Sequence, residues 1–135
     1  MRAFREAVEA GDLDAVEALL AEDVVFSSPV VFKPYPGKAI TAAILRAVAQ
    51  VFEDFRYERE LAGPDGRDHA LVFAARVGDR ELTGCDFIHL DKNGLIDEFT
   101  VMVRPLSGAQ ALAAAMGARF EEIAKEAQAR SASAS

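Results

Sequence analysis

Two turn sequences divide residues 71–104 into three segments, and this pattern constrains the fold more than any other feature of the chain. Apolar residues recur at every second position in the first segment, residues 71–77. Gly78-Asp79 then suits a tight two-residue hairpin, because glycine accepts the positive φ that such a turn requires. Residues 91–94, Asp-Lys-Asn-Gly, mark a second hairpin. The pattern predicts three successive antiparallel strands, the second over about 80–90 and the third over about 95–104.

The two turns place Asp86 on the apolar face of this predicted meander. With the first turn at residues 78–79, Asp86 lies opposite Leu71, and opposed residues share a face. With the second loop at residues 91–94, Asp86 lies opposite Phe99, which gives the same face. A carboxylate among apolar side chains is costly unless it is protonated, hydrogen-bonded or open to a cavity. We therefore expect Asp86 to mark a pocket; the alternative is a structural aspartate whose hydrogen bonds are satisfied by an amide or a buried water.

Helices are predicted both before and after the meander in the sequence. Apolar residues at three- and four-residue spacings predict two short helices that meet at Gly11, a third from about residue 39, and a last one after Ser107. Further strands are expected at about residues 24–26 and 55–61. The order predicts an α+β fold in which helices lie on one side of a curved antiparallel sheet.

The chain is expected to form one domain over residues 1–130. Residues 131–135 hold no large apolar side chain, which predicts a disordered tail. The formal net charge is -7 and no Lys/Arg run occurs, which disfavours nucleic acid and anionic membrane surfaces as partners. No apolar stretch of about 18 residues is present and Glu6 interrupts any signal-peptide core, so a cytoplasmic protein is expected. The single cysteine, Cys85, excludes an internal disulfide, and we predict neither a metal nor a cofactor.

The chain resembles the nuclear transport factor 2-like superfamily, in particular its SnoaL-like and ketosteroid isomerase-like branch. The resemblance rests on Phe4, residues 11–16 (GDLDAV), residues 21–29 (AEDVVFSSP), Gly37, and residues 86–90 (DFIHL) running to Gly94. It implies a cone-shaped, cystatin-like fold, in which a curved antiparallel sheet wraps around the N-terminal helices and a C-terminal helix follows. It also implies an open end that admits a small, mostly apolar molecule, and commonly a homodimer built on the outer sheet face.

Most of the isomerase pattern fails when it is carried across residue by residue. Asp86 falls where that family keeps a protonated carboxylic acid that donates a hydrogen bond to a developing oxyanion. Ser28 stands in place of the catalytic base, and a serine hydroxyl without an adjacent base does not abstract a carbon-bound proton at neutral pH. Phe4 stands in place of the tyrosine donor. The resemblance therefore retains one of three catalytic groups.

Asp86 is the candidate catalytic residue. His69 shares the inward side of Leu71 but lies at a strand end near a turn, where exposed histidines are common. The turns leave the orientation of Tyr57 open. The candidate ligand-binding residues are Ser28, Phe26, Phe4, Tyr57, His69, Phe73, Phe99, Val101 and Val103.

The opposite face of the meander is also largely apolar, and something should cover it. A two-fold partner is one candidate, with Arg76, His89, Glu98 and Arg104 as a polar rim. The C-terminal helix is the other candidate, unless that helix closes the pocket mouth. The residues of this outer face are Val72, Ala74, Cys85, Phe87, Thr100 and Met102.

Two functions follow from these features. The first is a small-molecule-binding protein with an apolar pocket around Asp86, acting on a small cyclic or carbonyl compound; isomerase, cyclase and lyase reactions stay open. The alternative is a non-catalytic dimeric module in which Asp86 is structural.

Overall fold

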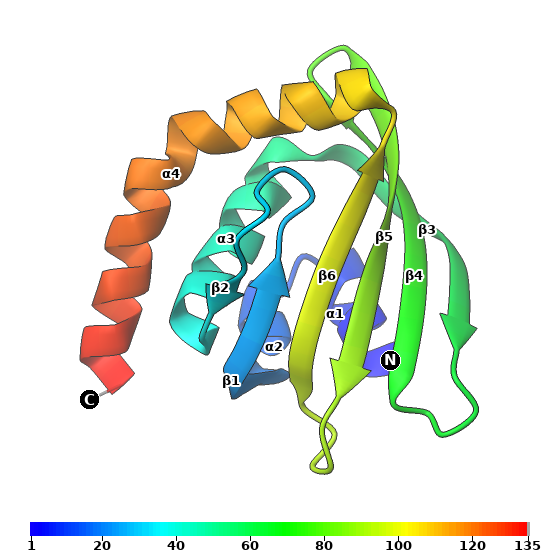
Figure 1. The fold of residues 1–135 in the computed structure, drawn as a ribbon, viewed down its shortest axis with the longest axis vertical. Helices are drawn as coiled ribbons and strands as arrows, with labels where there is room; N and C mark the ends of the chain where they lie inside the picture. Colours follow the sequence, from blue (N-terminus) through cyan, green and yellow to red (C-terminus); the bar gives the residue numbers. More distant parts are fainter. Residues whose placement is uncertain (135) are drawn as a thin grey trace.

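The computed structural model describes residues 1–134 (Figure 1). Its elements, in chain order, are α1 (Arg2–Glu9), α2 (Leu13–Ala18), β1 (Leu20–Ser27), β2 (Tyr35–Pro36), α3 (Lys38–Val51), β3 (Glu53–Ala62), β4 (Asp68–Val77), β5 (Arg80–Leu90), β6 (Ile96–Arg104) and α4 (Leu106–Ala134). The predicted α+β class is confirmed, with N-terminal helices, a curved sheet and a C-terminal helix. Among the helices described, none is long and apolar enough to cross a bilayer.

The six strands form one sheet in the order β2-β1-β6-β5-β4-β3. The sheet is mixed, since β1 runs parallel to β6, and this corrects the expectation of a wholly antiparallel sheet. The two strands are far apart in the chain, so no hairpin forces them to run in opposite directions. β2 pairs antiparallel with β1, with Phe26 opposite Tyr35.

The first hairpin of the meander has the predicted register. Val77 lies opposite Arg80, and Leu71 lies opposite Asp86. Gly78 adopts a φ of 59°, as the tight turn requires. The face of Asp86 is thereby set by a turn that the sequence specifies directly.

The second hairpin differs from the prediction by two residues, and Asp86 lies opposite Val101. The loop closes earlier than expected, because Asp91 N donates a hydrogen bond of 2.7 Å to Leu95 O. A bulge then adds one residue, Asp97, to β6. Each one-residue shift alone would move the side chains of β6 to the opposite face of the sheet, but the two shifts together restore the original face. Asp86 therefore still points toward the helices.

Helices α1, α2 and α3 pack on one face of the sheet and form the core with it (Figure 1). The largest fully buried side chains are Phe73, Phe99, Leu20, Leu71, Ile96, Val24 and Thr41. This face is the one on which the turns place Asp86, so the core and the candidate site share it.

Helix α4 is longer than the sequence predicts, because it begins at Leu106 and continues to Ala134. This corrects the expected tail for residues 131–134; Ser135 lies outside the described residues. Alanine is a strong helix former, and Arg130 near the helix end binds Glu17 of α2. In Figure 1, α4 crosses one end of the sheet and then runs beside α3.

Candidate functional site

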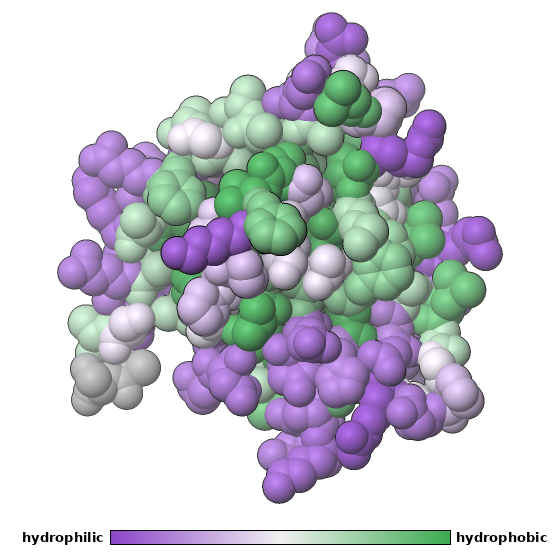
Figure 2. Space-filling model, viewed as in Figure 1, coloured by the Kyte–Doolittle hydropathy of each residue, from purple (hydrophilic) through white to green (hydrophobic). Residues whose placement is uncertain are grey.

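A cavity of about 390 Å³ lies between the helices and the inner face of the sheet. Its polar side chains are Ser28, Tyr35, Tyr57 and Asp86, and the rest of its wall is apolar. In the view of Figure 2, apolar side chains gather in the middle of the molecule, over the β1–β2 loop, and polar side chains surround them. The apolar wall consists of Phe4, Val8, Gly11, Leu13, Val16, Phe26, Pro29, Val30, Val31, Ile44, Leu45, Val48, Ala49, Phe52, Phe55, Phe73, Phe99, Val101, Leu112, Ala113, Met116, Gly117, Phe120 and Ile123.

Asp86 and Tyr57 form a buried polar pair in the wall of this cavity. The Tyr57 hydroxyl donates a hydrogen bond of 3.2 Å to Asp86 Oδ2. The two residues are only 6% and 8% exposed, respectively. Within the described part of the chain, Asp86 Oδ1 has no hydrogen-bond partner. One carboxyl oxygen is therefore held by the protein, while the other is left for a ligand or water.

Burial raises the pKa of Asp86 to about 7, although the hydrogen bond from Tyr57 opposes this shift. The pKa of Tyr57 is raised too, first by burial and then by the nearby Asp86 charge, so its hydroxyl keeps its proton. Near neutral pH the carboxyl group thus exists in both protonation states. It can donate a hydrogen bond in one state and accept a proton in the other.

Aromatic rings surround the polar pair. Phe55 packs edge-on to Tyr57 with ring centroids 5.0 Å apart, and it stacks on Phe73 at the same separation. Phe99 contacts both Phe4 and Phe26, with centroids 5.6 Å apart in each case. These contacts give the cavity flat apolar walls.

The structure places eight of the ten candidate residues in the cavity wall: Asp86, Ser28, Phe26, Phe4, Tyr57, Phe73, Phe99 and Val101. His69 and Val103 are not in the wall, which corrects those two expectations. His69 lies near the start of β4, where its Nε2 is 2.8 Å from Gly66 O in the preceding turn. Val103 lies opposite Gly84, toward the far end of β6. Alternation sets the face of a strand residue, but it says nothing about distance along the strand.

The contribution of α4 to the wall was not among the predicted site residues. Leu112, Met116 and Phe120 recur every fourth residue and all line the cavity, together with Ile123. That spacing is a detectable signal of one apolar helix face. The sequence does not show what this apolar face packs against. The structure shows that it covers the pocket.

One other cluster carries side chains of the metal-ligating kind, within the described residues. His89, Asp97 and Glu98 lie close together near one end of β5 and β6. His89 Nδ1 lies 2.6 Å from Asp97 Oδ1, and this hydrogen bond raises the pKa of His89. The hydrogen bond accounts for the arrangement of the pair, and we assign no metal to it.

With this geometry in view, comparisons with known proteins decide the family. The family model of the SnoaL-like domain matches residues 1–99. The chain belongs to the SnoaL-like family. A crystal structure of a steroid delta-isomerase from Pseudomonas aeruginosa is 48% identical, with a TM-score of 0.84 over 88% of this chain and 87% of that one. The predicted superfamily is thereby confirmed.

Two further solved structures show how widely this SnoaL-like fold is shared. An uncharacterized bacterial protein with a cystatin-like fold, from Silicibacter pomeroyi DSS-3, is 40% identical, with a TM-score of 0.87 over 96% of this chain and 91% of its own. The epoxide hydrolase/cyclase-like enzyme SalBIII is 21% identical, with a TM-score of 0.63 over 76% and 86% of the two chains; it shows likeness of fold alone. No curated protein sequence matches significantly. The family and its neighbours support small-molecule binding in general.

Proposed function

We propose that this SnoaL-like protein binds a small cyclic or carbonyl compound in its apolar cavity, with Asp86 as hydrogen-bond donor or general acid. The observation that carries the proposal is the buried pair of Asp86 and Tyr57 in an otherwise apolar wall. A protonated carboxyl group in such surroundings donates to a carbonyl or enol oxygen without competition from water. The Tyr57 hydroxyl donates its one proton to Asp86 Oδ2 and so holds the carboxyl group in place.

The steroid delta-isomerase among the relatives supports isomerase-type chemistry, and the family resemblance adds cyclase and lyase reactions. Ser28 lines the cavity, and its Oγ accepts a hydrogen bond of 3.1 Å from Val30 N. Within the described residues its hydroxyl makes no hydrogen bond to a basic side chain, so it does not act as the missing base. We therefore expect turnover of a classical steroid isomerase substrate to be absent.

The acidity of Asp86 tests the proposal directly. The carboxyl carbon of Asp86 is followed by NMR during a pH titration, with and without small cyclic ketones and phenols. We expect a pKa near 7 that moves when a phenol binds, because the ligand hydroxyl replaces water at the free carboxyl oxygen. An ordinary or lowered pKa that no compound disturbs would show a structural carboxylate instead.

Removal of the Tyr57 hydroxyl tests the other half of the pair. Tyr57→Phe is expected to weaken ketone binding about tenfold, because Asp86 loses the hydrogen bond that holds its carboxyl group in place. Titration calorimetry measures the change. Tyr35→Phe is the matched control, since Tyr35 also lines the cavity but makes no hydrogen bond to Asp86. Equal affinities for both variants and the parent would remove Tyr57 from the binding site.

A second proposal is a homodimer through the outer sheet face. On that face Phe87 and Met102 are 43% and 59% exposed, and α4 does not cover them because it lies over the pocket. Arg104 and Glu98 lie at opposite ends of β6. A two-fold axis across the strands brings Arg104 of one copy toward Glu98 of the other, so the face is complementary to itself.

Met102→Glu is expected to weaken this dimer at least about tenfold, because it places a charge in an apolar contact. Sedimentation over a range of concentrations measures the dissociation constant. Phe32→Glu is the control, since Phe32 is fully exposed but belongs to the β1–β2 loop. A parent protein that stays monomeric at every concentration contradicts the proposal.

A further inference from the structure

Helix α4 packs on α3 and forms a wall of the pocket that is only partly buried. It contributes six residues to the cavity, and of these only Leu112 and Ile123 are buried. Between them, Phe120 is 46% exposed, and its ring centroid lies 6.4 Å from that of Tyr35 in β2. In this middle stretch Met116 packs against the core and Arg119 Nη1 donates a hydrogen bond of 2.9 Å to Gln50 Oε1 of α3, so it is held less fully than the stretches around Leu112 and Ile123.

Gly117 lies in this partly exposed stretch, between Leu112 and Ile123. A side chain at Gly117 would meet no atom within 4 Å, so packing does not require a glycine there. Glycine inside a helix weakens it, because the backbone gains freedom in the unfolded state. In Figure 1, α4 changes direction along its length: its first part crosses the end of the sheet, and its second part runs beside α3. We call residues 106–116 the first arm and residues 118–134 the second arm. Gly117 lies between these two arms in the sequence and is a natural point of flexibility in α4.

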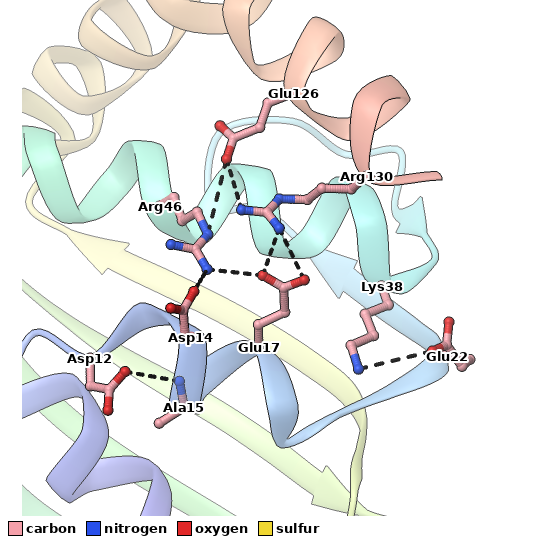
Figure 3. A network of polar contacts seen from close by, with 9 residues as sticks. All are labelled: Asp12, Asp14, Ala15, Glu17, Glu22, Lys38, Arg46, Glu126 and Arg130. Atoms are coloured by element: carbon pink, nitrogen blue, oxygen red, sulfur yellow. Dashed lines mark hydrogen bonds and ion pairs between the residues drawn. The ribbon is translucent and has the colours of Figure 1, made fainter. Parts of the chain in front are cut away.

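The two arms are held by different forces. In the first arm, Gly108 packs so closely that an added Cβ would lie 2.8 Å from Leu82 Cβ in β5. In the second arm, Arg130 Nη1 lies 2.9 Å from Glu17 Oε1 of α2, and Arg130 Nη2 lies 3.1 Å from Glu126 Oε1 (Figure 3). Close packing thus fixes the first arm, while the second is held by the buried side chain of Ile123 and by the ion pairs of Arg130 with Glu17 and of Glu126 with Arg46.

Glu17 is the centre of this charge network, which we call the latch: Asp14, Glu17, Arg46, Glu126 and Arg130. Arg46 of α3 also binds Glu17, with Nη2 3.0 Å from Oε1 (Figure 3). One carboxylate therefore joins α2 to both α3 and α4. Without it, two guanidinium groups would face each other with less negative charge between them.

The latch is incompletely satisfied. Within the described residues, the Nε atoms of Arg46 and Arg130 are buried and have no hydrogen-bond partner. The two arginine side chains are 24% and 27% exposed, so salt and water weaken their ion pairs. Opening the latch therefore costs less free energy than separating a closely packed apolar interface, because its hydrogen bonds are incomplete and its ion pairs are partly exposed.

We propose that the part of α4 after Gly117 is a lid over the pocket, hinged at Gly117 and latched to α2 and α3 through Glu17. The lid controls entry of the small molecule, and this regulatory role rests on the proposed binding function. The opening itself is a property of the protein without any ligand, so it is measured separately from binding.

Hydrogen–deuterium exchange of the unliganded protein tests the lid. Glu17→Gln is expected to raise amide exchange of residues 118–132 about fivefold, because loss of the latch favours the open state. Residues 106–116 and the sheet should stay unchanged. Arg130→Gln is a second variant with the same expected pattern. Glu121→Gln is the matched control, since Glu121 is on the same helix but 85% exposed and outside the latch.

Unchanged exchange in both latch variants overturns the lid, and so does an equal rise over the whole chain. Stopped-flow binding of prodan, an apolar fluorescent ketone, then links the lid to the pocket. Glu17→Gln should raise the association and dissociation rates together by about fivefold, with a smaller change in affinity. If no variant binds prodan while exchange rises in the lid alone, the proposed binding function fails and the lid stands. If prodan binds with equal rates in all variants, the lid does not gate the pocket.

Discussion

The parent protein is expected to lose stability relative to Asp86→Asn as the pH rises from about 5 to about 8. The native carboxyl group, with its pKa near 7, keeps a proton that the unfolded chain releases near pH 4. Unfolding between these values therefore releases a proton, so higher pH favours the unfolded state. The loss of unfolding free energy begins above the pKa that Asp86 has in the unfolded chain. It grows toward pH 7 and is constant at higher pH. From pH 5 to pH 8 the parent should lose about 2 to 3 kcal/mol that Asp86→Asn retains.

Urea unfolding of both proteins at the two pH values measures this difference. Asp79→Asn is the control, since Asp79 lies in the first hairpin turn with its side chain 95% exposed. If the difference in unfolding free energy between the parent and Asp86→Asn is the same at both pH values, the carboxyl group has one charge state throughout. The pocket would then hold a satisfied carboxylate rather than a group that exchanges protons. A stabilised Asp86→Asn that no longer binds ketones would show that the site is maintained at the expense of stability.

Gly84→Ala is expected to cost about 3 kcal/mol of unfolding free energy, because the new methyl group has no room. An ideal Cβ at Gly84 would lie 2.4 Å from Phe73 Cζ and 2.7 Å from Met102 O. The Phe73 ring is 1% exposed and cannot move without displacing the core, and Met102 O belongs to a paired backbone. Because Phe73 also lines the pocket, the variant should bind ketones less well at temperatures where it stays folded.

Thermal and urea unfolding measure the loss. Gly117→Ala is the opposite control, since a side chain there meets nothing and alanine favours the helix by about 1 kcal/mol. The same chemical change should therefore destabilise the sheet at one position and stabilise α4 at the other. An unchanged unfolding midpoint for Gly84→Ala would mean that Phe73 and its neighbours have room to repack.

The inward position of Asp86 could be predicted because it depends on local rules. A two-residue turn fixes the partner of every residue in its hairpin, so Gly78-Asp79 alone places Asp86 opposite Leu71. The second turn gave the wrong partner and the right face, since an early loop closure and the bulge at Asp97 cancel. Face is thus a more robust prediction than register.

The contact between Asp86 and Tyr57 could not be predicted in this way. A bulge in β3 falls between Tyr57 and Arg59, so the two do not share a face although two positions separate them; Tyr57 is buried and Arg59 is exposed. The site also depends on α4, whose path is decided by packing against α3 and by the latch. Such long-range contacts leave no periodic signal in the sequence.

The parallel pairing of β1 with β6 has a consequence for synthesis of the protein on the ribosome. β1 leaves the tunnel early, but its long partner strand begins only at Ile96. Until then, β1 has only the two-residue β2 beside it, and its remaining backbone groups stay unpaired. The nascent chain therefore cannot complete its sheet before β6 has emerged. During that interval the open edge of β1 is a template on which another chain can pair.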